Sequence, residues 1–373
     1  MPSDTSLPEH INDNLASWND RAGSCTSYDE DIPLSKQPTS TAASEAISTA
    51  EKITSPANRF FASLPGVLIT CVVCCLLWGS AFPCIKIGYG LFNIAATDTA
   101  SQMLFAGARF TISGLMVITG MSIAGKRFLH PERTDLRAVL LLSLFQTILQ
   151  YICFYQGLSK ASGVTSSIVT ASSNFLAIIF AALLFRTERL TTRKVIGCLA
   201  GFGGVVAINL GGEQTGLTFT LGGEGLILGS AIAGAMSTCL IGIFGKKHNP
   251  VMLSGWQFLV GGLVLTVWAI AAGGHLAPPQ PLPALCLLVY MGFISAMAYS
   301  LWSRLLAVNP VSRVSVFGFL NPVFGFLLSA LLLGEGGLIA PGVAALALAL
   351  VCGGIIIVNL PGRTAAPRIP NKA

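Results

Sequence analysis

Residues 175–188 read FLAIIFAALLFRTE, and residues 322–335 read PVFGFLLSALLLGE. The two stretches align without a gap at a spacing of 147 residues, with Asn174 and Asn321 preceding them in the same register. Each is an apolar run that ends in a glutamate, so each predicts a membrane helix with one acid at its end. The chain therefore contains a duplicated helix.

A second duplicated stretch follows in each copy. Residues 203–210 (GGVVAINL) match residues 353–360 (GGIIIVNL) at a spacing of 150 residues. The change from 147 to 150 indicates a three-residue insertion between the two matching helices of the second copy. Two matches in the same order predict a tandem repeat.

The composition excludes a soluble fold. Of the 373 residues, 53% are hydrophobic and only 10% are charged, whereas about a quarter of an ordinary soluble domain is charged. A soluble enzyme, a disordered protein and a nucleic-acid module are all excluded, because such a chain would expose large apolar patches to water. Apolar runs of about 20 residues predict membrane spans at 67–89, 101–124, 137–158, 163–185, 193–211, 222–244, 250–272, 283–304, 311–333 and 338–360.

These runs predict an all-α polytopic membrane protein with ten transmembrane helices, arranged as two inverted five-helix repeats. We expect a disordered acidic cytoplasmic leader at 1–63, the first repeat at 64–212, the second at 213–361 and a basic cytoplasmic tail at 362–373. The leader carries nine acids and four bases with little apolar periodicity, which is typical of disorder. Because the leader is polar, we expect the first span to act as an anchor and not as a cleaved signal peptide.

Loop charges predict the orientation of the two repeats. Seventeen Lys and Arg residues fall on the side of the N-terminus, and two, Lys86 and Lys160, fall on the opposite side. This bias predicts that both termini are cytoplasmic. Each repeat has five spans, an odd number, so the second repeat enters the membrane upside down. Such inverted repeats place a site near the midplane and suit alternating access.

Polar side chains inside the spans mark candidate positions for a substrate site, because they are costly in lipid unless they face a partner or a wet cavity. We expect a cavity with neutral hydrogen-bonding groups and aromatic walls. Interhelical hydrogen bonds and interfacial anchoring are the alternative for each residue taken singly. The candidates are Trp78, Arg109, Gln146, Gln150, Tyr151, Asn174, Gln257, Tyr299, Trp302 and Asn321.

Within this set, the symmetry-related Asn174 and Asn321 carry the most weight. Pro322 removes a backbone donor after Asn321, so we expect a broken helix there and an unbroken one at Asn174. Arg109 lies about eight residues into its span and has two interpretations, pairing with helix carbonyls or binding an anionic substrate. Glu188 and Glu335 lie at span ends, where we expect them to fix helix ends and loops.

Cysteine and histidine give no catalytic or metal-binding pattern. Nine of the ten cysteines are scattered over apolar segments, which predicts no disulfide framework, and Cys71, Cys74 and Cys75 are expected to pack in the interior. All four histidines lie outside the predicted spans. We therefore expect no metal, no cofactor and no enzymatic activity.

The sequence resembles the drug/metabolite transporter superfamily, and specifically two EamA-like domains in tandem. The resemblance rests on residues 78–80 (WGS), Arg109-Phe110, the runs that end in Glu188 and Glu335, and the Gly-rich ends of the fifth and tenth spans, and it covers about 67–360. It implies a ten-helix carrier with a central cavity, commonly an exporter of amino acids, other metabolites or drugs. The chain departs from the family pattern at Asn174-Phe175, where a proline is common, and in its long leader.

We therefore predict a secondary active transporter, an exporter of a small organic metabolite such as an amino acid or a drug-like solute, in the plasma or inner membrane. The predicted partners are a small-molecule substrate and the lipid bilayer, without nucleic acid. A coupling ion and a homodimer are left open. The alternatives are a carrier of phosphorylated or nucleotide-linked sugars, as other members of the superfamily are, and a non-transporting receptor or scaffold.

Overall fold

The computed structural model describes residues 56–158, 160–161, 163–210, 220–333 and 341–360. Within these ranges the regular structure is helical, without strands. The first copy consists of α4 (Leu64–Leu91), α5 (Thr99–Ala124), α6 (Leu136–Leu142), η3 (Ser143–Leu149), α7 (Gln150–Leu158), α8 (Gly163–Ile179), η4 (Phe180–Leu184) and α9 (Thr192–Leu210). The second consists of α10 (Glu224–Lys247), α11 (Pro250–Ala271), α12 (Pro281–Val308), α13 (Val311–Ser315), η5 (Val316–Phe319), α14 (Leu320–Leu333) and α15 (Pro341–Asn359).

Nine helical segments of the described ranges are long and apolar enough to cross a membrane. They coincide with nine of the ten predicted spans. The remaining one, predicted at 193–211, forms α9, whose first turn carries Arg193 and Lys194, and it is not among the nine. The all-helical polytopic fold is thus confirmed, while the count of ten spans stays a prediction.

The leader differs from the expectation at its end. Residues 56–62, which the sequence assigns to a disordered leader, form helix α3 (Pro56–Ala62). Side chains of the second copy bind its last carbonyls, because Asn309 Nδ2 donates to Phe61 at 2.8 Å and Arg313 Nη1 donates to Ala62 at 3.2 Å. The rest of the predicted leader, at 1–55, lies outside the described residues.

The helices start where the sequence offers capping groups. Ser63 Oγ accepts from the Gly66 amide at the start of α4, and Asp98 Oδ1 accepts from the Ser101 amide at the start of α5. Asn249 Oδ1 accepts from the amides of Val251 and Met252, with Pro250 in the first turn of α11. These side chains bind amides that the first helical turn leaves without partners.

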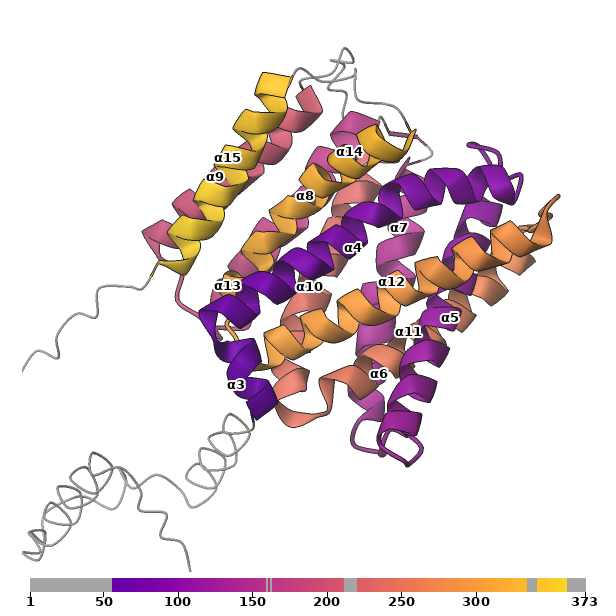
Figure 1. The fold of residues 1–373 in the computed structure, drawn as a ribbon, viewed down its shortest axis with the longest axis horizontal. Helices are drawn as coiled ribbons and strands as arrows, with labels where there is room; N and C mark the ends of the chain where they lie inside the picture. Colours follow the sequence, from indigo (N-terminus) through magenta and orange to yellow (C-terminus); the bar gives the residue numbers. More distant parts are fainter. Residues whose placement is uncertain (1–55, 159, 162, 211–219, 334–340, 361–373) are drawn as a thin grey trace, which may run out of the picture. The chain divides into compact units, whose positions relative to one another are not determined.

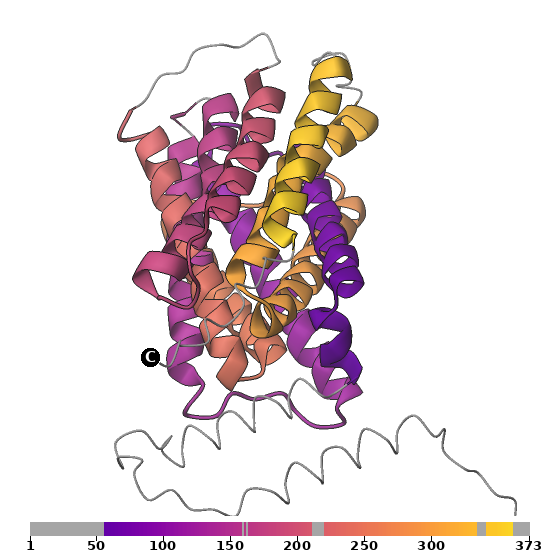
Figure 2. The same ribbon diagram turned by 90° about the vertical axis from the view of Figure 1, so that its left-hand side faces the viewer.

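The two copies exchange neighbours in a symmetric pattern. Helix α4 packs against α12 and α14 of the second copy, and the corresponding helix α10 packs against α7 and α8 of the first. The remaining equivalent helices pair with each other, α5 with α11 and α9 with α15. Figure 1 shows α4 between α12 and α14, and Figures 1 and 2 both place α15 beside α9.

Glycine contacts show that equivalent helices run antiparallel. A Cβ atom on Gly107, early in α5, would lie 2.6 Å from Thr266 Oγ1, late in α11, whereas one on Gly114 would lie 2.5 Å from the amide nitrogen of Leu259. In α9, Gly197 meets Gly354 and Gly204 meets Ala347 of α15, again in reversed order. The second copy is therefore inverted relative to the first, as the charge pattern predicts.

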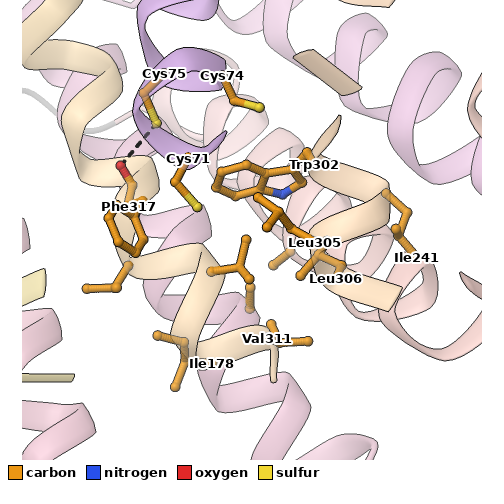
Figure 3. Close-up of a cluster of buried hydrophobic side chains, with 14 of the residues drawn as sticks. Cys71, Cys74, Cys75, Ile178, Ile241, Trp302, Leu305, Leu306, Val311 and Phe317 are labelled. Atoms are coloured by element: carbon orange, nitrogen blue, oxygen red, sulfur yellow. Dashed lines mark hydrogen bonds between the residues drawn. The ribbon is translucent and has the colours of Figure 1, made fainter. Parts of the chain in front are cut away.

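The three neighbouring cysteines of α4 are packing residues at a junction between the copies. Cys71, Cys74 and Cys75 are fully buried, and Figure 3 shows them beside Trp302, with the Cys75 thiol directed at the Phe317 carbonyl oxygen. The Sγ–O distance is 3.3 Å for this contact and 3.4 Å from Cys74 to Ala298. In the described residues, no three Cys, His, Asp or Glu side chains are placed to hold a metal.

Helical geometry changes within three spans. A π-helical segment, η3, interrupts the third span, another, η4, ends the fourth, and the 3₁₀ segment η5 interrupts the ninth. The ninth span changes geometry one turn before Pro322, whose missing N–H leaves the Gly318 carbonyl without its helical donor. Asn174, in contrast, lies inside regular helix α8. The change of helical geometry is thus found just before Asn321 and not at Asn174, while Asn321 and Pro322 themselves lie in α14.

Candidate functional site

The second helices of the two copies meet at a shared pattern. Residues 107–114 (GARFTISG) and 255–262 (GWQFLVGG) align at a spacing of 148 residues, so Arg109 corresponds to Gln257 and Phe110 to Phe258. The glycines at both ends of the pattern let the two backbones approach closely. Phe110 and Phe258 consequently stack on each other, with ring centroids 5.1 Å apart and an interplanar angle of 3°. This stacked pair marks an approximate two-fold axis between the copies.

Further aromatic rings extend from the stacked pair to both sides. Tyr151 and Tyr299 also lie 148 residues apart, and each contacts its own phenylalanine edge to face, at 4.6 Å for Phe110–Tyr151 and 4.8 Å for Phe258–Tyr299. Trp78 packs on both Tyr299 and Trp302 at 5.0 Å. We call this set the central aromatic cluster: Trp78, Phe110, Tyr151, Phe258, Tyr299 and Trp302.

Arg109 lies beside this cluster, near the middle of α5. It follows Thr99, the first residue of α5, by ten positions, which is about 15 Å along a helix of about 39 Å. The side chain is only 5% exposed. Its guanidinium lies 4.4 Å from the Phe110 ring centroid, and Nη2 donates to the Tyr151 hydroxyl at a long 3.4 Å. The site is thus deeper than the sequence indicates, because α5 starts two residues before the predicted span.

The electrostatic neighbours of Arg109 are phenols. Tyr89, Tyr151, Tyr155 and Tyr299 are close enough to interact electrostatically with the guanidinium, and Tyr151 is also hydrogen-bonded to it. Neither the Lys194–Glu188 ion pair nor the His248–Asp135 contact includes Arg109. The protein therefore surrounds this buried cation with dipoles and leaves its charge without a counter-ion from the described residues.

Several buried donors near the axis have no partner among the described residues. They are Arg109 Nε, Trp78 Nε1 and Gln257 Nε2. The other end of the Gln257 amide is held, since its Oε1 accepts from Thr147 Oγ1 at 2.8 Å. Buried polar atoms normally find partners, and all three of these atoms are N–H donors. These three N–H groups can donate to an acceptor, whereas the unpartnered hydroxyls of Ser113 on α5 and Ser300 on α12 can donate or accept.

Six of the ten predicted site residues thus lie in or beside one connected group: Trp78, Arg109, Tyr151, Gln257, Tyr299 and Trp302. Gln146 is buried next to Thr147 in η3. The other three lie elsewhere, because Gln150 packs against Gly234 of α10 and Asn174 packs against Gly318 of η5, three residues before Asn321. Asn321 Oδ1 is buried without a partner in the described ranges. No hydrogen bond or ring contact found among the described residues joins the side chains of these three to the central aromatic cluster, although Gln150 directly precedes Tyr151 of that cluster in the chain.

Glu188 lies at one end of the bundle and joins the two copies. It accepts a hydrogen bond from the amide of Ser312, at 3.1 Å, and another from the Ser312 hydroxyl at the start of α13, while Lys194 Nζ lies 2.7 Å from its Oε2. This matches the expectation that Glu188 fixes a helix end. Its counterpart Glu335 lies outside the described residues.

A second contact between the copies lies outside the spans on the side of α3. His248 Nδ1 and Asp135 Oδ1 are 2.5 Å apart, and they join the loop after α10 to the start of α6. Trp256 Nε1 adds a hydrogen bond to the Leu129 carbonyl at 2.8 Å. Polar contacts between the two copies therefore hold them together at this end of the molecule.

Sequence reasoning missed the stacked phenylalanines. Phe110 and Phe258 sit in apolar spans, where an aromatic residue is unremarkable, and only Phe110 was noticed, as part of a family motif. The 148-residue spacing that relates 107–114 to 255–262 was available in the sequence. It would have pointed to both rings and to the correspondence between Arg109 and Gln257.

Comparison with known proteins agrees with this architecture. The model of the EamA-like transporter family matches the chain twice, over residues 65–210 and 221–360. The chain belongs to the EamA-like transporter family. The two matches coincide with the two inverted copies, so this EamA-like transporter is an integral membrane protein built from tandem domains of the family.

Two similar bacterial proteins carry the name of transporters. The chain is 27% identical to an uncharacterized transporter of Bacillus subtilis, YetK, over 62% of this chain and 71% of that one. It is 26% identical to the uncharacterized inner membrane transporter YedA of Escherichia coli, over 76% and 88%. A solved crystal structure shares the fold of this EamA-like transporter, with a TM-score of 0.65 and 20% identity over 80% of this chain and 98% of that one. These names point to a transporter and not to an enzyme.

Proposed function

We propose that this EamA-like transporter is a secondary active carrier that exports a small organic metabolite from the cell by alternating access. The observation that carries the proposal is the pairing of two inverted copies around a buried group of donors at mid-membrane depth. Inverted repeats commonly bind their substrate at the interface between the copies and expose it to each side in turn. The proposed cargo is an amino acid or another solute of that size.

The proposed orientation is both termini in the cytoplasm of a cell in whose plasma or inner membrane the carrier lies. The support is the concentration of Lys and Arg on the side of the N-terminus, which is the cytoplasmic side by the positive-inside rule. On this orientation, the Glu188–Ser312 and Asp135–His248 contacts lie toward the cytoplasm. They would close that side of the carrier while the other side opens.

The alternative cargo, a phosphorylated or nucleotide-linked sugar, fits less well. A phosphate monoester carries close to two negative charges at neutral pH. In the described ranges, Arg109 is the one basic residue buried in the middle of a span. A single buried cation matches a monoanion or a zwitterion better than a dianion.

The test is solute flux in proteoliposomes. Wild-type protein should move members of a panel of amino acids, small carboxylates, neutral metabolites and phosphate esters, with protein-free vesicles as the blank. Proton and sodium gradients are then imposed in turn, and the gradient that drives accumulation of the solute identifies the coupling ion. Exclusive exchange of phosphate esters would contradict the proposed cargo, and absence of flux across the whole panel would contradict the proposed function.

Two substitutions test the candidate residues in the same vesicles. We expect Asn321→Leu and Gln146→Leu to abolish flux while the protein still inserts and elutes as a single species, because each removes a buried polar group near an irregular helix segment. Gln280→Leu, at the exposed start of α12, is the matched control and should transport normally. Full flux in both variants would remove Asn321 and Gln146 from the site.

The alternative of a non-transporting receptor is tested by deletion of residues 1–55. This deletion keeps α3, whose carbonyls bind Asn309 and Arg313. A carrier should keep its flux after the deletion, whereas a receptor that signals through this segment would show no flux with or without it.

A further inference from the structure

We infer that the solute carried by this protein has a single carboxylate, which binds to Arg109 at the centre of the bundle. The inference rests on the proposed transport function and adds the chemical class of the substrate. It starts from the state of Arg109, a cation that is 5% exposed in the middle of a membrane helix. Burying an unpaired charge is costly, so this site gains most from a ligand that brings the opposite charge.

The guanidinium offers one edge suited to a carboxylate. Nε and Nη2 lie on the same edge of a guanidinium, and a carboxylate can accept two parallel hydrogen bonds from such an edge. In Arg109, Nε has no partner among the described residues, and Nη2 reaches the Tyr151 hydroxyl only at 3.4 Å. That distance exceeds the usual 2.7–3.2 Å of an N–H···O bond. Two oxygens of a bound carboxylate would satisfy both nitrogens.

Aromatic rings lie against the guanidinium. Its carbon is 4.4 Å from the Phe110 ring centroid and 5.8 Å from the Tyr151 ring centroid. Cation–π contacts of this kind hold the group in place but provide no acceptor for its N–H bonds. The Nε–H of Arg109 therefore remains for a ligand.

The side chains around Arg109 favour a ligand with one negatively charged group and an apolar remainder. The Tyr151 hydroxyl lies beside it, and a tyrosine hydroxyl can donate to a far lone pair of a carboxylate. Trp78 Nε1 and Gln257 Nε2 are further unpartnered donors of the central group. The aromatic rings of Trp78, Tyr299 and Trp302 present apolar edges, which suit an apolar remainder of the solute. We therefore expect a small monocarboxylate or zwitterion with an apolar side.

The experiment is ligand-dependent thermal stabilisation of the full-length protein in detergent. The probes are two matched pairs in which an amide replaces the carboxylate, namely 3-phenylpropanoate with its amide and L-leucine with its amide. Phenyl phosphate is added as an aromatic phosphate ester. A ligand that binds the folded protein raises its melting temperature, because at a free concentration c it stabilises the folded state by RT ln(1 + c/Kd). We expect at least one carboxylate to bind at least tenfold more tightly than its amide and than phenyl phosphate.

Variants assign the effect to one residue. Arg109→Gln should weaken carboxylate binding at least tenfold, Arg109→Lys should weaken it less because the charge remains, and Arg304→Gln should bind like the wild type. Arg304 is a suitable control because it lies on α12 against the Phe61 ring, outside the central aromatic cluster. The comparison of carboxylate with amide in the wild type stays valid even if a variant fails to fold.

The outcomes separate this inference from the proposed function. Equal stabilisation by carboxylates and amides, tighter binding of phenyl phosphate, or unchanged binding by folded Arg109→Gln would overturn the inference. If flux is seen only for neutral solutes, the carrier function stands and the carboxylate site falls. If no solute of the panel is transported, the carrier function itself falls.

Discussion

Helices α5 and α11 occupy equivalent places in the two copies, yet their central residues differ. Both use glycines seven positions apart to approach each other, and both place a phenylalanine on the axis. Beside that phenylalanine, α5 carries Arg109 and α11 carries Gln257. The repeated features build the interface, whereas the residue that differs gives the interface its charge.

The two side chains are also held differently. Gln257 is fully buried and bound through its oxygen by Thr147, so half of its amide is fixed by the protein. Arg109 has one long hydrogen bond to Tyr151 and an unpartnered Nε. The packing frame is thus repeated in both copies, whereas the charge beside the axis is present in the first copy and not at the equivalent position of the second.

The largest effect should come from closing the gap between α5 and α11. In Gly114→Val, the new side chain would collide with the backbone of α11, because even a Cβ would lie 2.5 Å from the Leu259 nitrogen and 2.8 Å from the Gly255 oxygen. Overpacking costs about 1–3 kcal/mol and occasionally more, and we expect the upper end here because the collision is with backbone atoms that cannot change rotamer. We expect little folded protein by size-exclusion chromatography in detergent.

Gly120→Val is the control for that experiment, on the same helix. A Cβ at Gly120 meets nothing within 4 Å, so this variant should fold like the wild type. If Gly114→Val were as stable as Gly120→Val, α5 and α11 would not pack through these glycines and the inverted pairing would be wrong.

An intermediate effect is expected at Glu188, which joins the first copy to the second. Glu188→Ala removes the acceptor for the Ser312 amide and hydroxyl and the partner of Lys194. Hydrogen bonds to charged groups are worth about 1.5–3 kcal/mol. The thermal midpoint in detergent should fall clearly, whereas Glu132→Ala, at an exposed position of the loop before α6, should leave it unchanged. Equal midpoints would show that the Glu188 contact does not stabilise the bundle.

The smallest effect should come from Thr147→Val, which keeps the shape of the side chain but removes the donor to Gln257. A buried acceptor left unpaired costs about 1–3 kcal/mol, and we expect the lower part of that range because the amide can rotate. Thr119→Val is matched, since the Thr119 hydroxyl is exposed and bonds only to carbonyls of its own helix. If both variants lost the same stability, Gln257 would not depend on Thr147.

Much of the fold could be predicted from the sequence, because membrane helices are recognised by long apolar runs and by the charges of the loops between them. The apolar runs located the helices, and the loop charges together with the odd number of spans predicted the inversion seen in the antiparallel α5–α11 and α9–α15 pairs. The boundaries followed less well. Helix α3 was assigned to the leader, since a seven-residue helix has no periodicity long enough to detect.

The site followed only in part, because periodicity shows which residues share a face and not which helix lies opposite. Arg109, Tyr151 and Tyr299 were named as candidates, but their connection runs through Phe110 and Phe258, which only the pairing of two distant helices brings together. Gln150 and Asn174 share a face with other polar residues in the sequence, yet they pack against glycines of neighbouring helices. The hydrogen-bonding capacity of a residue in a span therefore does not show whether that residue packs against a neighbouring helix or lines a binding site.

The most direct test of the comparison between Arg109 and Gln257 exchanges the two residues. Carboxylate binding is measured by thermal stabilisation in the wild type, in Arg109→Gln and in the double variant Arg109→Gln/Gln257→Arg. Because the two positions are equivalent about the Phe110–Phe258 pair, with Tyr299 in the place of Tyr151, we predict that the double variant recovers at least part of the affinity that the single variant loses. A folded double variant that binds no better than Arg109→Gln would contradict the account.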